Sequence, residues 1–223
     1  LGADYGVIGR YSVNKDQINM EIRLFDAADD KMLMGKAYKG PLDEQDQMIY
    51  KFTDAAINEL TGKPGLATTQ IAFVTPPSDK RERDVFLTDI LDRKMRQVTR
   101  HRNLVVSPRF SPDGTYLAYT SYHSGNQSLY ITDLRQSKTT RVISRRKGMN
   151  LAPAWSPGGD TMVVTLSFKG NPDLFLINNR GEILQQLTKQ TGINVSPTFS
   201  PDGRHIVFVS DRSGKPQLYL MEL

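Results

Sequence analysis

Three histidines are the residues in this sequence best suited to bind a metal ion or to act as a general base. His101, His123 and His205 stand 22 and 82 residues apart, and no two share the i, i+4 spacing that places two metal ligands on one helix face. The sequence contains no cysteine, which excludes disulfides, thiolate nucleophiles, Cys-ligated zinc and iron–sulfur clusters. A metal site is therefore not expected, and His101 is the histidine that we expect a partner to reach.

Catalytic and phosphate-binding motifs are also absent from the sequence. A serine nucleophile on a strand-to-helix turn would show as Gly-x-Ser-x-Gly, and no such stretch is present. The pairs Lys147–Gly148 and Lys169–Gly170 lack the flanking glycines and the following helix that would cradle a phosphate. We therefore expect no catalytic residue and no cofactor, and a function in binding.

Basic side chains form two clusters along a chain whose formal net charge is only +5. Neither cluster is interleaved with the aromatic residues that stack on bases, which argues against a nucleic-acid partner. The clusters are either a solvated rim or a docking site for an acidic protein patch, in which case the charges would speed the encounter more than they add affinity. They consist of Arg93, Lys94, Arg96, Arg100 and Arg102, and of Arg141, Arg145, Arg146 and Lys147.

A repeat of 44 to 45 residues organises most of the chain. The related stretches Ser107–Gly114, Ala152–Gly159 and Ser196–Gly203 recur at intervals of 45 and 44 residues. Each is followed by a second related stretch, and a fourth copy of that second stretch lies upstream. A recurrence of this length is typical of a repeated architecture. The second stretches are Leu129–Leu134, Leu174–Asn178 and Leu218–Leu223, with Val85–Ile90 as the upstream copy.

Each repeat reads as four antiparallel strands, which together match one blade of a β-propeller. Gly, Pro, Asn and Asp separate short alternating runs, and the Pro112–Gly114 step has the chemistry of a tight turn. The aromatic residues at matched positions, Phe110, Trp155 and Phe199, are expected to pack between neighbouring blades. In the second repeat we expect strands at Arg109–Ser111, Tyr116–Ser121, Leu129–Leu134 and Thr140–Ser144.

The first 65 residues lack this period and are expected to form a separate domain. Strands are predicted at 7–13, 18–26 and 32–38, followed by a helix with Asp43 as its N-cap and Gly62 at its end. Its apolar face would consist of Met48, Ile49, Phe52, Ala55, Ala56 and Leu60. The sequence thus predicts a mainly β protein: a small α+β domain at residues 1–65 and, at residues 66–223, a partial β-propeller of about 3.5 four-stranded blades.

The composition fits this globular assignment. Hydrophobic residues make up 38% of the chain, charged residues 24%, and the mean hydropathy is −0.44. No apolar run is long enough to span a bilayer. The chain begins with Leu1 instead of Met, and we expect it to be a fragment of a longer protein.

Specific residues make this chain resemble the TolB family, a periplasmic component of the Tol–Pal cell-envelope system. The resemblance rests on the junction Leu60–Gly65, the strand Ile71–Val74 and the repeated Ser-Pro-Asp-Gly stretches, with Leu1–Tyr5 and Ile8–Arg10 similar to the middle of the family's N-terminal domain. It implies a propeller that has six blades when complete. Ser-Pro-Asp-Gly repeats also occur in propellers attached to prolyl-oligopeptidase-type hydrolases.

The resemblance implies a periplasmic, non-enzymatic protein-interaction module. Its propeller would bind the peptidoglycan-associated lipoprotein Pal at the channel mouth and would be used by certain colicins. The family contacts the inner-membrane protein TolA through an N-terminal segment that we cannot place on any residue here. The module would support outer-membrane integrity, cell division and import of macromolecules, and would lie at the outer membrane only through its partner.

Blade geometry predicts where a partner docks. The loop from the outermost strand to the next blade opens at the same end as the loop between the second and third strands, and loops on a rigid scaffold commonly carry binding residues. The residues just before each blade-opening proline would lie nearest the channel, and the resemblance places the Pal contacts there. The expected partner-binding residues are Arg102, Asn103, Arg146, Lys147, Met149, Asn150, Ala152, Ile193, Asn194, Val195 and Ser196.

Two alternative functions remain open from the sequence. The propeller could gate a prolyl-oligopeptidase-type hydrolase domain encoded elsewhere in the chain. It could also be an enzyme that works through a metal ion in the central channel, which metal binding together with hydrolytic turnover would reveal.

Overall fold

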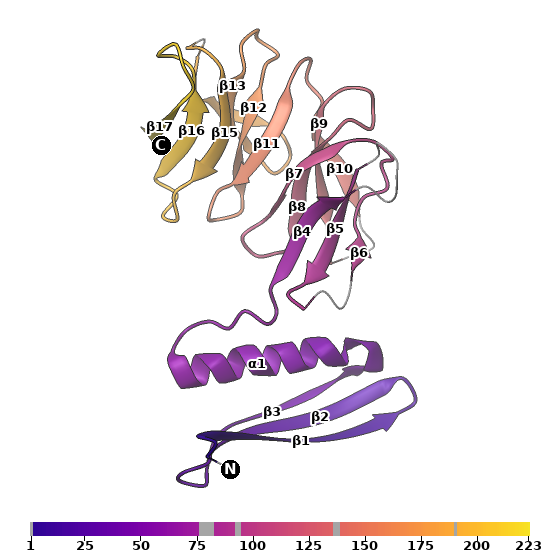
Figure 1. The fold of residues 1–223 in the computed structure, drawn as a ribbon. Coiled ribbons are helices and arrows are strands. Elements are labelled where there is room, and N and C mark those ends of the chain that lie inside the picture. The colour runs from indigo at the N-terminus through magenta and orange to yellow at the C-terminus, as the bar shows by residue number, and fades with distance from the viewer. Residues whose placement is uncertain (1, 76–82, 92–94, 136–138, 190) are drawn as a thin grey trace. The chain divides into compact units, whose positions relative to one another are not determined.

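A computed structural model describes residues 2–75, 83–91, 95–135, 139–189 and 191–223. The chain divides into two compact units, each of which is described by itself. One contains the described residues of 1–71 and 88–94, and the other those of 72–87 and 95–223 (Figure 1). The expected boundary between residues 65 and 66 stays a prediction. Arg93 and Lys94, members of the first basic cluster, lie outside the described residues.

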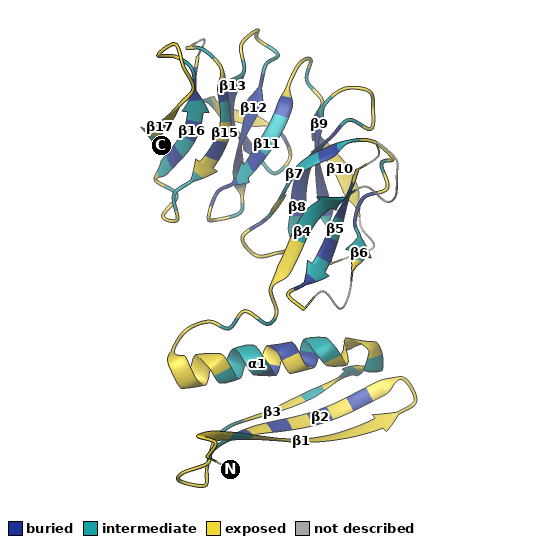
Figure 2. Cartoon of the chain, in the orientation of Figure 1, coloured by how far each residue is buried: buried dark blue, intermediate teal, exposed yellow. Residues whose placement is uncertain are grey.

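The N-terminal unit contains a three-stranded antiparallel meander and one helix. Its strands are β1 (Tyr5–Asn14), β2 (Gln17–Asp26) and β3 (Lys31–Pro41), in the order β1-β2-β3. Strand β2 alternates strictly, with Ile18, Met20, Ile22 and Leu24 buried and the residues between them exposed (Figure 2). Such alternation places all four apolar side chains on one face of the sheet.

Helix α1 (Gln45–Thr61) covers the apolar face of β2. Met48 and Phe52 pack there, whereas Ile49 and Leu60 are exposed, so the predicted apolar face was too wide. The expected N-cap is also wrong, because the 3₁₀ turn η1 (Leu42–Glu44) precedes the helix and places Glu44 at the cap without a side-chain bond. Gly62 ends the helix in the left-handed conformation at φ 68°, as expected for a C-terminal glycine.

The segment after the helix is fastened to the helix by one carboxylate. Asp54 accepts hydrogen bonds from the backbone N–H groups of Ala67 and Thr68, at 2.6 and 2.9 Å, and from the Thr68 hydroxyl at 2.5 Å. A side chain at Gly65 would clash with Asp54, because its Cβ would lie 2.4 Å from the Asp54 Cα. The segment is therefore held against the helix along its path, in contrast to a free linker.

The second unit consists of four antiparallel sheets in succession, as the repeat predicted (Figure 1). The two central sheets have four strands each, and the first and last have three. The first sheet has no strand equivalent to the innermost strand, and the last has none equivalent to the outermost one, among the residues that the structure describes. The strands are β4 (Gln70–Thr75), β5 (Asp84–Asp89) and β6 (Arg96–Gln97); β7 (Val105–Phe110), β8 (Tyr116–Ser121), β9 (Ser128–Asp133) and β10 (Thr140–Ser144); β11 (Asn150–Trp155), β12 (Thr161–Leu166), β13 (Asp173–Asn178) and β14 (Ile183–Gln186); β15 (Asn194–Phe199), β16 (His205–Ser210) and β17 (Gln217–Glu222).

The innermost strands are longer than expected from the sequence. Strand β7 begins at Val105, four residues before the expected start at Arg109. The register between β7 and β8 shifts between Val106 and Arg109, and equivalent shifts occur in β11 and β15. This β-bulge lets the strand continue through Pro108, which has no N–H to donate to a regular ladder.

The Ser-Pro-Asp-Gly stretch is a self-contained turn. The Ser111 hydroxyl donates to the Asp113 carboxylate at 2.6 Å, the same carboxylate accepts the Thr115 N–H at 3.0 Å, and Gly114 adopts φ 69°. The hydrogen bond from Ser111, followed by those from Thr115, lowers the pKa of Asp113 to about 2. The Asp113 carboxylate is therefore ionised at neutral pH. The equivalent turn of the third sheet has Gly158 in its place, and there the Ser156 hydroxyl donates to Asp160 at 3.2 Å.

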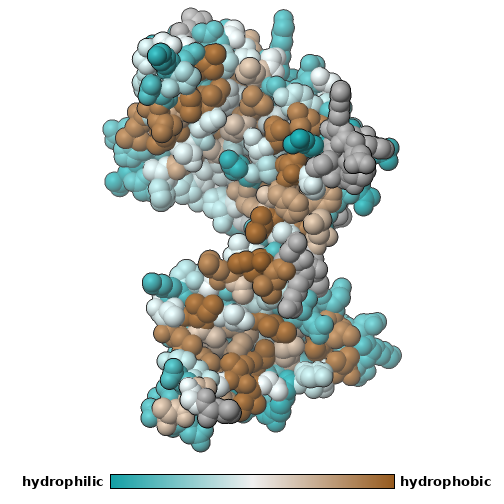
Figure 3. All heavy atoms as spheres, viewed as in Figure 1, coloured by the Kyte–Doolittle hydropathy of each residue, from teal (hydrophilic) through white to brown (hydrophobic). Residues whose placement is uncertain are grey.

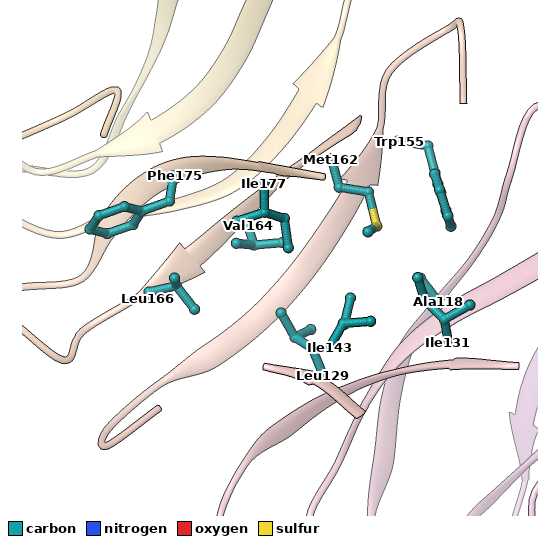
Figure 4. Close-up of a cluster of buried hydrophobic side chains, with 10 residues drawn as sticks. All are labelled: Ala118, Leu129, Ile131, Ile143, Trp155, Met162, Val164, Leu166, Phe175 and Ile177. Atoms are coloured by element: carbon teal, nitrogen blue, oxygen red, sulfur yellow. The ribbon is translucent and has the colours of Figure 1, made fainter. Parts of the chain in front are cut away.

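Apolar side chains fill the space between consecutive sheets. Figure 4 shows Met162 and Trp155 facing Ala118 and Ile131 of the preceding sheet. The Trp155 indole Nε1 also donates to the carbonyl of Arg109 at 3.2 Å, across the same junction. Phe110, Trp155 and Phe199 each end the innermost strand of their sheet and pack into successive clusters, which confirms the expected packing between blades.

The last sheet has an exposed apolar face. Leu218 and Leu220 of β17 are 73% and 67% exposed, while Tyr219 and Met221 on the other face pack against the core. Brown surface at the upper left of Figure 3 lies over this part of the chain. The sheet thus carries apolar side chains on both faces, as expected for a blade with neighbours on each side.

Truncating a side chain at the junction in Figure 4 should destabilise the propeller unit. Met162 is fully buried, so we expect Met162→Ala to lower the free energy of unfolding by about 2–5 kcal/mol. Urea denaturation followed by tryptophan fluorescence would measure the loss. Met95→Ala is the matched control, because Met95 is 57% exposed and its truncation should change stability by less than about 0.5 kcal/mol. Equal losses in the two variants would contradict the packing described here.

Candidate partner-docking site

Among the described residues, six loops gather at one end of the propeller sheets, and we call this end the docking end. Val105 pairs with Ser121, and Ser121 pairs with Ser128, so the loops that flank these residues lie at the same end of the sheet. Contacts between the loops support this: the Met149 N–H donates to the Ser167 hydroxyl at 2.8 Å, and the Ile193 N–H to the Asp211 carboxylate at 2.6 Å. The docking end consists of residues 98–104, 122–127, 145–149, 167–172, 187–189, 191–193 and 211–216.

Several expected contact residues are exposed at this end. Met149 is 38% and Ile193 48% exposed, and Arg102, Lys147 and Ser196 are exposed as well. Since Ser167 and Asp211 fix the backbones of Met149 and Ile193, these two apolar side chains are presented from rigid positions. The sequence analysis did not identify the supporting roles of Ser167 and Asp211.

Other expected residues are partly engaged inside the protein. The Arg146 guanidinium donates to the Ser144 hydroxyl at 2.9 Å and to the Gly181 carbonyl at 3.1 Å. Asn103 donates from Nδ2 to the Tyr122 carbonyl at 3.1 Å, which closes its loop. Arg146 and Asn103 therefore shape the docking end. Val195, another expected contact residue, is half-buried in strand β15.

Asn150 does not present its side chain to a partner, and the expectation that it does so is wrong. The residue has no exposed surface. Its Nδ2 donates to the carbonyls of Arg146, Gln127 and Gly148, and its Oδ1 accepts from the Ser144 hydroxyl and the Arg146 N–H. The amide therefore closes the loop before β11 and joins it to the preceding sheet.

Asn194 is the equivalent residue at the next junction, and the same correction applies. It has no exposed surface, and its Nδ2 donates to the Asp173 carboxylate at 3.1 Å and to the Gly192 carbonyl at 3.1 Å. Arg212 donates to its Oδ1 at 3.0 Å. Asn194 thus links the last sheet to the sheet before it.

Buried aspartates form part of the same junctions. Asp173 accepts the Thr188 hydroxyl at 2.8 Å, and Asp84 accepts the Thr99 hydroxyl at 2.6 Å. Both carboxylates are almost fully buried. The sequence analysis missed this pair, although the recurrence of an Asp with a Thr fifteen residues later could have indicated it.

The innermost strands β7, β11 and β15, which carry the β-bulges, form the side of the sheets that would face the channel. Ser107, Ala152 and Ser196 have φ values of 54°, 52° and 53°, a region that L-residues rarely adopt, and each precedes a proline. All three line a cavity of about 500 Å³ formed by the innermost strands of three successive sheets. Ala152 and Ser196 thus lie on the innermost strands, and their contact with a partner stays a prediction.

His101 and His123 stack at the junction between the first two sheets. Their ring centroids lie 5.0 Å apart, and His101 also packs against Tyr119 and Tyr130. Burial, and after it the nearby His123, lowers the pKa of His101, while Asp84 opposes the shift. His101 is half-buried, so a partner would reach it less easily than the neighbouring Arg102.

The contact between His101 and Ser121 is not a catalytic arrangement. His101 Nδ1 lies 2.7 Å from the Ser121 hydroxyl, but Ser121 has no exposed surface for a substrate to reach. Asp84 accepts the backbone N–H of His101 at 3.0 Å and does not orient the ring. Within the described part of the chain, no three His, Asp or Glu side chains are placed to hold a metal ion.

Comparison with known proteins yields consistent matches. The profile of the TolB beta propeller domain family matches residues 57–223. The Tol-Pal system protein TolB of Desulfotalea psychrophila is 62% identical over 141 residues, which are 63% of this chain and 32% of that protein. The chain thus spans about a third of the length of the curated relatives that it matches.

Two solved structures extend the comparison. The crystal structure of TolB from Acinetobacter baumannii matches all of this chain and 56% of its own, with a TM-score of 0.84 and 29% identity. A structure of prolyl endopeptidases matches 84% of this chain and 36% of its own, with a TM-score of 0.52 and 13% identity. The second likeness concerns the fold alone.

Removing the buried amide at the third sheet should cost stability. Asn150→Ala leaves several buried carbonyls and a hydroxyl without their partner, so we expect the free energy of unfolding to fall by about 2–4 kcal/mol. Thermal and urea denaturation would measure this. Asn126→Ala, in an exposed loop at the same end, should have no comparable effect. An Asn150→Ala variant as stable as the parent would contradict the role assigned to this amide.

Acid should weaken the first junction through His101. The lowered pKa means that the folded protein takes up this proton less readily than the unfolded chain. Stability is therefore complete above about pH 6.5 and falls as the pH drops through the unfolded value of 6.5 towards the folded one. His101→Asn keeps a polar atom near Ser121 and should flatten this pH dependence between about pH 7.5 and 5.5 in denaturation experiments. The same slope in the parent and the variant would refute the assignment.

Proposed function

This chain belongs to the TolB family, defined by the TolB beta propeller domain that matches residues 57–223, and we propose that it is a protein-docking module of the Tol–Pal system. In this proposal the docking end binds the lipoprotein Pal in the periplasm. Other members of the system, TolA among them, would contact parts of the whole protein that this chain does not supply. Roles in outer-membrane integrity, cell division and colicin import belong to the same proposal.

One observation carries the proposal. Loops from successive sheets present Met149 and Ile193, both partly exposed and both fixed at the backbone, at the same end of the propeller sheets. Adaptable apolar side chains on a rigid scaffold, with polar groups around them, are typical of a protein interface. The expected contacts are therefore Arg102, Lys147, Met149, Ala152, Ile193, Val195 and Ser196, with Arg146 and Asn103 as partly engaged neighbours.

The names of the relatives support a binding role over the two alternatives. The Desulfotalea protein is named as a component of the Tol-Pal system. The likeness to prolyl endopeptidases has 13% identity and supports only the shared propeller fold. No helix in the described part of the chain is long and apolar enough to cross a membrane.

Introducing a charge at the docking end should weaken Pal binding. Met149→Glu places a carboxylate where an apolar contact is expected, so we expect the dissociation constant for Pal to rise by about tenfold or more, as for loss of a central contact. Because Met149 is 38% exposed, the melting temperature should stay within about 2 °C of the parent. Isothermal titration calorimetry of the intact protein with Pal would measure binding.

Leu184→Glu provides the matched control. Leu184 is 53% exposed and lies on β14, away from the docking end. Its substitution should leave Pal affinity unchanged. The proposal fails if Pal binds the Met149→Glu variant as tightly as the parent, or if the intact protein does not bind Pal.

A further inference from the structure

Charge is distributed unevenly between the two ends of the propeller sheets. The loops of the docking end carry nine cationic side chains and one acidic one, a net charge of +8, or +6 with the buried Asp84 and Asp173 beside them, whereas the whole chain has +5. The described residues of the loops at the other end carry three cations and four acids. The docking-end residues are Arg100, Arg102, Arg145, Arg146, Lys147, Lys169, Lys189, Arg212 and Lys215, with Asp211; those at the other end are Arg135, Arg180, Arg204, Asp113, Asp160, Glu182 and Asp202.

Acidic neighbours do not neutralise these cations. The ion pairs among the described residues join Arg10 and Arg23 to Glu21, and Arg135 to Asp133, and none lies at the docking end. Asp211, the acidic residue of these loops, accepts the backbone N–H of Ile193, and the buried Asp84 and Asp173 accept the hydroxyls of Thr99 and Thr188. The positive charge of this end is therefore open to an outside partner.

Some of the cations are held in fixed positions by neutral groups. The Arg212 guanidinium lies 4.6 Å from the centre of the Tyr219 ring, and that of Arg146 lies 5.9 Å from the centre of the Phe168 ring. Both also donate to neutral oxygens, those of Asn194 and of Gly181. Fixed arginines lose little side-chain freedom when they meet an anionic group, which favours binding.

We propose that the docking end binds an acidic protein surface, and that its cations accelerate association more than they slow dissociation. The inference rests on the proposed function and specifies the chemistry of the partner's surface. Met149 and Ile193 are partly exposed apolar side chains in the same loops as these cations, and apolar contacts surrounded by charged groups are typical of a protein interface. A cluster of like charges focuses the electric field and raises the encounter rate, and salt screens this effect.

Arg145 and Lys147 are the cations best suited to a test. Both are exposed, and no hydrogen bond or ion pair joins either side chain to another described residue. We therefore expect Arg145→Glu combined with Lys147→Glu to preserve the fold and to change only the surface charge. Arg180→Glu combined with Arg204→Glu makes the same change of charge at the other end and is the matched control.

Stopped-flow association of the intact protein with Pal at about 50 and about 500 mM NaCl would test the inference. The association rate of the parent should fall about tenfold at the higher salt concentration. At the lower salt concentration the Arg145→Glu/Lys147→Glu variant should associate about tenfold more slowly, with a dissociation rate within about twofold of the parent. The control variant should match the parent.

The outcomes separate this inference from the proposed function. If Pal binds at a rate that neither salt nor the docking-end variant changes, or if the control variant slows binding equally, the inference is wrong and the proposed function stands. If Pal does not bind at all, the proposed function is wrong, and a fluorescent poly-glutamate peptide decides the inference. Phosphatidylglycerol vesicles serve as a second anionic probe. Peptide binding that the docking-end variant abolishes supports an acidic protein surface. Binding to the vesicles alone, or to neither probe, overturns the inference.

Discussion

Side-chain packing between consecutive sheets is the interaction on which the propeller unit depends. Backbone ladders join the strands of each sheet, whereas consecutive sheets meet mainly through side chains such as Met162 and Ile131, with a few backbone hydrogen bonds such as that from the Asn194 N–H to the Pro172 carbonyl. The bond from the Trp155 indole to the Arg109 carbonyl adds a directional contact at one junction. Because the loops at the docking end come from different sheets, their spacing depends on these contacts between sheets and not only on the ladders within any one sheet.

Adjacent residues at the junctions have opposite roles. Met149 points to solvent, and the next residue, Asn150, is fully buried; Ile193 and Asn194 repeat this arrangement one sheet later. Successive residues of an extended chain point in opposite directions, so a loop can hold itself with one side chain and offer the next to a partner. The buried amides thereby position the exposed apolar residues, although they have no direct part in the proposed interface.

The sequence was sufficient to predict the repeat, the strands and the role of the three aromatic residues, because these depend on periodicity. It did not predict which side of the chain Asn150 and Asn194 would face, since polarity alone does not distinguish an exposed amide from a buried, fully bonded one. The early start of β7 at Val105 was missed because Pro108 argues against a strand unless a bulge accommodates it. The helix face was overestimated because a sheet buries only the residues directly above it, and Ile49 lies to one side.

The innermost strands are also the edges of their sheets, and an unprotected edge invites a foreign segment to extend the ladder. In β7, β11 and β15 this edge is interrupted at the same place by a left-handed residue followed by proline. A polypeptide threading the channel would find no continuous row of backbone donors across this interruption. It would have to be recognised by its side chains, and these three edges are poor templates for amyloid-like stacking.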